Sequence, residues 1–181
     1  MVTMTQNPRP FWRRNLWRIL GWGCAAALIL TPLVAMQFTD EVHWTGSDFL
    51  FAIIVFGTVG LLFELSVRLF PDYFYRAGMG CALLASFMIV WANAAVGMIG
   101  NEDNPINLLF FGVVLIALTG AIIARFRAQG MALAMLVALI TQISIATIFG
   151  LLGGDPRGGI FSILLSSLWL LAAALFKASR R

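Results

Sequence analysis

The chain has 181 residues, of which 61% are hydrophobic and 11% charged, and its formal net charge is +4. Soluble domains carry about 25% charged residues, and a mean hydropathy of +0.93 leaves too few polar side chains to coat a soluble globule. The composition therefore excludes a soluble domain and a disordered tail, and it predicts an integral membrane protein.

Six apolar stretches have about the length of 20 residues that a helix needs to cross a bilayer. They cover residues 17–38, 49–70, 77–99, 106–124, 131–150 and 160–177. Their apolar residues are continuous rather than alternating, which excludes a transmembrane barrel. The segments between them are too short for a soluble domain. We therefore predict an all-α bundle of six transmembrane helices, forming a single transmembrane domain over residues 1–181.

Turn-forming residues separate these stretches. Pro71 ends the second, Asn104-Pro105 is a typical helix start before the fourth, and the glycine-rich segment 153–159 predicts a loop before the sixth. The fifth stretch contains several polar residues, so a partly re-entrant segment is the alternative to a simple span. We favour a span because the charge distribution requires it.

The charges indicate the orientation. If the N-terminus is cytoplasmic, all 12 Lys and Arg residues except Arg157 fall on the inner side. The acids Asp40, Glu41, Asp48, Glu102, Asp103 and Asp155 fall outside. The connecting segments are short, which is the regime of the positive-inside rule. We expect both termini to be cytoplasmic. The net positive charge suits anionic lipid headgroups and needs no nucleic-acid partner.

The arginine-rich start also fits a signal peptide. No small-x-small cleavage site follows it, and the apolar stretch is long enough to span, so an uncleaved first helix is expected.

Small residues mark one face on each of three predicted helices, and we expect these faces to point into the bundle, because transmembrane helices associate through small side chains. The faces consist of Ala82, Ser86, Asn93 and Gly97, of Ala117, Gly120, Ala121 and Ala124, and of Ala134, Ala138, Gln142 and Ala146.

Glu64 is an acid inside the second stretch, toward its cytoplasmic half. An ionisable residue at such a depth is a candidate functional site, here a proton carrier or a cation ligand. Arg68 follows at i+4, so a local ion pair near the headgroups is the structural alternative. Asn93 and Gln142 could line a polar path with Glu64, or each could hydrogen-bond a neighbouring helix.

The predicted outer loops contain oxygen ligands. Residues 100–107 hold Glu102, Asp103 and several amides, and Asp40 and His43 fall on the same side. Hard cations such as Ca²⁺ prefer these groups, so a composite outer-loop cation site is one hypothesis. The spacing matches no EF-hand, and capping of the next helix explains the same residues.

Other classes of site find little support. A single histidine excludes bis-histidine haem and multi-histidine metal centres within one chain. The chain has no phosphate-binding loop and no convincing catalytic triad. We expect no catalytic residues, no metal and no cofactor, and therefore no enzyme.

Three segments carry a resemblance. Residues 34–42 read VAMQFTDEV, followed by Trp44-Thr45 and Asp48-Phe49; residues 91–105 read WANAAVGMIGNEDNP; and residues 124–126 read ARF. In these segments the chain resembles a family of small polytopic bacterial inner-membrane proteins without an assigned activity. The resemblance implies a multi-pass protein of the bacterial cytoplasmic membrane and transfers no site residues.

The sequence favours a non-catalytic structural or accessory protein. It would work through helix and loop contacts in the lipid bilayer, with a membrane-protein partner or as a homo-oligomer, and its acidic outer loops would be the recognition surface. The alternative is a small transporter or channel with Glu64 as the protonatable coupling group.

Overall fold

The structure, a computed structural model, describes residues 11–179, without the side chains of residues 11–15 and 17. Within this range it has six helices that are long and apolar enough to cross a membrane, and no strand. They are α1 (Phe11–Ala35), α2 (Gly46–Leu69), α3 (Tyr73–Ala95), α4 (Leu108–Ile123), α5 (Ala128–Ile145) and α6 (Pro156–Ala178). This confirms the predicted all-α fold with six spans. Arg9, Arg180 and Arg181, which enter the predicted orientation, lie outside the described residues.

Two short elements extend these helices. The 3-10 turn η1 (Pro105–Asn107) leads into α4, and the π-turn η2 (Ala146–Leu151) continues α5. The fifth predicted stretch is thus continuously helical.

The chain divides into two compact units, one up to Gly60 and one from Leu61 onward, with the boundary inside α2. In the first unit, the Trp22 ring lies so close to Gly60 that a Cβ there would be 2.9 Å from it. The start of α2 is capped, because the Asp48 carboxylate accepts hydrogen bonds from the Thr45 N–H at 2.7 Å and the Thr45 hydroxyl at 2.8 Å.

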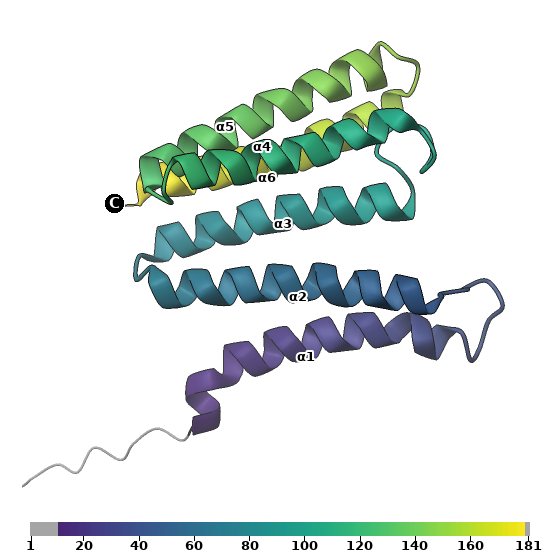
Figure 1. The fold of residues 1–181 in the computed structure, drawn as a ribbon, viewed down its shortest axis with the longest axis horizontal. Helices are drawn as coiled ribbons and strands as arrows, with labels where there is room; N and C mark the ends of the chain where they lie inside the picture. Colours follow the sequence, from purple (N-terminus) through teal and green to yellow (C-terminus); the bar gives the residue numbers. More distant parts are fainter. Residues whose placement is uncertain (1–10, 180–181) are drawn as a thin grey trace, which may run out of the picture. The chain divides into compact units, whose positions relative to one another are not determined.

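The second unit contains the end of α2 and a bundle of α3 to α6. In it α6 packs against both α3 and α5, and α4 packs against α5 (Figure 1). Trp169 and Phe176 of α6 are fully buried, as is Tyr75 of α3. The Tyr75 ring meets the Phe176 ring at a centroid distance of 5.0 Å. The Tyr75–Phe176 pair therefore fills space between α3 and α6.

The predicted small-residue faces lie inside this bundle. Ala117 and Ala121 of α4 are buried, as are Ala134 and Ala138 of α5 and Ala82 of α3. A Cβ on Gly120 would lie 2.6 Å from the Ala134 Cβ, so α4 and α5 approach closely at this point.

Several helix ends differ from their predicted positions, because side-chain caps fix them. Helix α3 begins at Tyr73 instead of residue 77, since the Asp72 carboxylate accepts a hydrogen bond from the Tyr75 N–H at 2.9 Å. It ends at Ala95 instead of residue 99, and Gly97 follows with a φ of +77°.

The predicted loop over residues 153–159 is too long. Helix α6 begins at Pro156, because the Asp155 carboxylate accepts a hydrogen bond from the Gly158 N–H at 3.1 Å and proline favours the first helical position. The predicted start before the fourth span is confirmed, since the Asn104 side chain accepts a hydrogen bond from the Ile106 N–H at 3.1 Å.

The π-turn η2 lies against the first turn of α6. A Cβ on Gly150 would lie 2.5 Å from the Gly159 Cα and 2.8 Å from its nitrogen. Two backbones therefore touch here with no room for a side chain.

We expect Gly150→Ala to destabilise the bundle by about 1–3 kcal/mol, because the added methyl group would push two backbones apart. Gly112→Ala is the matched control, since a Cβ on Gly112 has no atom within 4 Å. Thermal unfolding of both variants in detergent measures the difference. Equal melting temperatures would contradict the close contact.

Candidate functional site

Gln142 forms the best-connected polar group inside the bundle. Its side chain is fully buried. Its Nε2 donates to the Ser162 carbonyl oxygen at 2.9 Å and lies 3.3 Å from the Ser162 hydroxyl. Its Oε1 accepts a hydrogen bond from the Trp169 Nε1–H at 2.7 Å. The amide therefore joins α5 to α6 with both of its ends bonded, as a buried polar group requires.

Asn93 is also buried, but it bonds only within its own helix. Its Nδ2 donates to the Ile89 carbonyl oxygen at 2.9 Å. Its Oδ1 is buried without a hydrogen-bond partner among the described residues. Asn93 therefore does not connect helices in this structure as Gln142 does.

Glu64 and Arg68 form the ion pair that their spacing predicts. The Arg68 side chain is 64% exposed and the Glu64 side chain 14% exposed. An arginine in this position shields the carboxylate and directs its own charge away from the helix. The structure therefore contains the local ion pair that was the structural alternative to a functional role of Glu64.

The candidate polar residues make separate hydrogen bonds. Among the described residues, no hydrogen bond links Glu64, Asn93 and Gln142 to one another. The sequence missed Ser162 and Trp169 as the partners of Gln142. Their spacing of seven residues, two turns along one face of α6, is the signal that could have pointed to them.

Side-chain amides in the loop between α3 and α4 form hydrogen bonds with the backbone of the same loop. The Asn107 Oδ1 accepts hydrogen bonds from the Met98 N–H at 3.0 Å and the Ile99 N–H at 2.9 Å, and its Nδ2 donates to the Asn101 carbonyl oxygen at 2.7 Å. The Asn104 Nδ2 donates to the Ile99 carbonyl oxygen at 3.1 Å. These amides, considered above as cation ligands, fold the loop onto itself.

The Asp155 carboxylate connects this loop to the start of α6 by hydrogen bonds. Its Oδ2 accepts a hydrogen bond from the Gly100 N–H at 2.8 Å, in addition to the bond from Gly158. The Gly100 and Gly158 N–H groups, with a smaller contribution from the Arg157 charge, hold the pKa of the Asp155 carboxyl below its usual value. The ionised carboxylate therefore stabilises the contact between the two loops.

The loops that were predicted to face outward supply the candidate ligands of the cation site. Within residues 11–179, no group of three or more His, Cys, Asp and Glu side chains could hold a metal ion. Asp40 and His43 belong to the first unit, and Glu102 and Asp103 to the second. The composite cation site stays a prediction.

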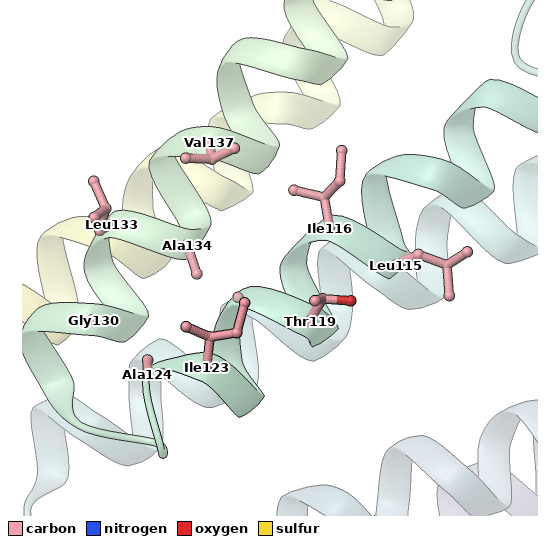
Figure 2. A pocket seen from close by; sticks show the side chains of 10 residues that line it. Leu115, Ile116, Thr119, Ile123, Ala124, Gly130, Leu133, Ala134 and Val137 are labelled. Atoms are coloured by element: carbon pink, nitrogen blue, oxygen red, sulfur yellow. The ribbon is translucent and has the colours of Figure 1, made fainter.

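Two hollows lie along the α4–α5 hairpin. One is an apolar groove of about 490 Å³ between the two helices (Figure 2). The other, of about 630 Å³, surrounds the turn that joins them and is lined in part by Arg125, Arg127 and Gln129. Neither hollow was predicted from the sequence, although the charge pattern predicts both arginines on the cytoplasmic side.

Comparison with known proteins finds no matching family model, no similar curated protein and no similar solved structure. The resemblance of residues 34–49 and 91–105 to a bacterial membrane-protein family therefore stays a prediction. The functional assignment depends on the geometry of the chain itself.

We expect Gln142→Leu and Trp169→Phe to be coupled by about 1 kcal/mol in a double-mutant cycle, since each removes a partner of the other. Unfolding in mixed detergent measures the cycle. Asn93→Leu is the control and should cost less than Gln142→Leu, because the Asn93 amide bonds only within its helix. Strict additivity of the two variants would contradict the hydrogen bond.

Asp155 makes stability depend on pH. Its pKa is lower in the folded chain than the unfolded value of about 3.9. The stabilisation is therefore complete above that value and is lost as the pH falls through the lowered pKa. Asp155→Asn should melt below the wild type at pH 6, and the difference should shrink below about pH 4.

Melting curves in detergent between pH 3 and pH 7 test this expectation. Asp103→Asn is the control, because Asp103 is an exposed acid in the loop that Asp155 contacts. A constant difference between Asp155→Asn and the wild type over the whole pH range would disprove the assigned role of the carboxylate.

Proposed function

We propose that this chain is a non-catalytic accessory component of the bacterial cytoplasmic membrane that binds another membrane protein through its first two helices. The distribution of basic residues supports a cytoplasmic position for both ends. The observation that carries the proposal is a contrast between the glycines of the two units.

Glycines in the second unit are mostly in close contact. Added Cβ atoms on Gly78, Gly120 and Gly130 would lie 3.1, 2.6 and 2.5 Å from side-chain atoms of neighbouring helices or turns. In the first unit, by contrast, added Cβ atoms on Gly21 and Gly57 would have no atom within 4 Å, and Gly60, beside the Trp22 ring, is the exception. No residue of the 18-residue apolar window of α1 is buried.

Small residues are the usual contact points between transmembrane helices, because they let backbones approach. Glycines of α1 and α2 that have open space beside them within the first unit therefore suit a helix of a second protein. The polar groups support the same function. Gln142 is bonded internally and Glu64 is paired with Arg68, which is a structural use of groups that a catalyst or transporter would expose to substrate.

The loops supply a second recognition element. Asp40, Glu41, Glu102 and Asp103 are exposed. Asp48 and Asp155 are occupied by the caps of α2 and α6. A partner that docks on the first two helices and carries a basic loop would therefore meet Asp40 and Glu41, which belong to the first unit.

The transporter alternative has less support. A coupling carboxylate must reach water on one side of the membrane. The Glu64 side chain is only 14% exposed, and Arg68 is paired with it.

We expect native mass spectrometry of the chain, extracted gently from its own membrane, to show a stoichiometric protein partner. Gly21→Leu should reduce the bound partner at least severalfold, because a bulky side chain would separate the helices. Gly112→Leu is the control, since Gly112 is also a helical glycine with open space beside it.

A monomer or homo-oligomer that carries only lipid would overturn the accessory function. Flux measurements with Glu64→Gln in proteoliposomes would then test the transporter alternative. Retention of the partner by Gly21→Leu would show that the contact lies on another face.

A further inference from the structure

We propose that the α4–α5 hairpin is a binding site for an anionic phospholipid, with an acyl chain in the groove between the helices and the phosphate at Arg125 and Arg127. This site is independent of the accessory function proposed above, because it lies wholly in the second unit and uses no residue of α1.

The groove is shaped for an apolar chain. Its floor is formed where small residues bring the helices together, at Gly120 beside Ala134. Larger apolar residues, such as Leu115 and Ile123 of α4 and Leu133 of α5, form its sides (Figure 2). The only hydroxyl group among the lining side chains belongs to Thr119. Such a lining matches a hydrocarbon chain and offers little to a polar solute.

The second hollow adjoins the groove at the end of the helices. Both are lined by Ala124 and Gly130, so the apolar space and the polar one are neighbours. The polar space also contacts Arg125, Arg127 and Gln129. An apolar groove beside two guanidinium groups has the layout of an acyl chain joined to a charged headgroup.

The turn that presents the arginines is fixed by the bundle. Arg125 and Phe126 have φ values of +49° and +57°, a conformation that costs a non-glycine residue about 1–2 kcal/mol. The Tyr75 hydroxyl donates to the Phe126 carbonyl oxygen at 2.7 Å, and Tyr75 is fully buried. The Tyr75 ring stacks on Phe70, which lines the polar hollow, at 4.0 Å. The site is therefore formed before any ligand arrives.

The charge at this end selects an anion. Arg125 and Arg127 are exposed and have no ion-pair partner among the residues that the structure describes. None of the residues lining the polar hollow is acidic. Guanidinium groups bind phosphate oxygens in bidentate geometry, and basic pockets between transmembrane helices are typical sites for anionic lipid headgroups. A lipid with net negative charge therefore fits better than a zwitterionic one.

The test uses the delipidated full-length protein in detergent, titrated with phosphatidylglycerol or with phosphatidylcholine of the same acyl chains. Native mass spectrometry measures bound lipid. We expect a preference for phosphatidylglycerol on the order of tenfold. Arg125→Gln with Arg127→Gln should reduce the preference to about onefold. The two arginines changed to lysine should restore part of it, because lysine keeps the charge but lacks the bidentate geometry. Arg157→Gln, at the other end of the bundle, is the matched control.

The groove is tested separately. Thr119→Trp should fill it and weaken the binding of both lipids severalfold. Leu118→Trp is the control, because its neighbouring exposed position does not line the groove. Melting temperatures without lipid confirm that each variant is folded. Equal affinity of the wild type for both lipids, an unchanged preference in the glutamine pair, or unaltered binding by folded Thr119→Trp would each overturn the proposal.

Discussion

Close approach of backbones at small residues is the constraint on which the second unit depends. In a bilayer, burying an apolar side chain between helices gains little, because the lipid is equally apolar. Packing must come from surfaces that fit closely, as at Gly120 against Ala134 and at Gly150 against Gly159. The same contact between α4 and α5 creates the groove, since two helices that touch at small residues leave a furrow between the larger side chains on either side.

Side-chain hydrogen bonds join different elements at three levels of the bundle. At one end, Asp155 connects the α3–α4 loop to the start of α6. In the middle, Gln142 connects α5 to α6. At the other end, Tyr75 of α3 holds the α4–α5 turn. Together these three groups involve α3, α4, α5 and α6. Few polar groups therefore connect the elements of this unit. Each of them is buried or lies at a loop, and each has a defined partner.

The sequence predicted the features that depend on local pattern. Runs of apolar residues gave the number of spans, and the i, i+4 spacing of Ala134 and Ala138 gave a buried face. Features that depend on distant residues were missed. The partners of Gln142 lie 20 and 27 residues away on another helix. The left-handed turn at Arg125 and Phe126 contains no glycine from which it could have been predicted. The hydroxyl of Tyr75, distant in the sequence, stabilises it. Helix ends were misplaced where a cap decides the start, as with Asp72 and Asp155.

The π-turn at Ala146–Leu151 has a consequence for how the length of this chain can vary. A π-turn accommodates one residue more than an α-helical turn, so the helix on either side keeps its register. Loss of one residue within η2 would convert it to regular α-helix and leave Gln142 and Asp155 facing their present partners. The same loss earlier in α5 would rotate everything beyond it by about 100°. Homologous chains should therefore gain or lose single residues in η2 far more readily than within the body of α5.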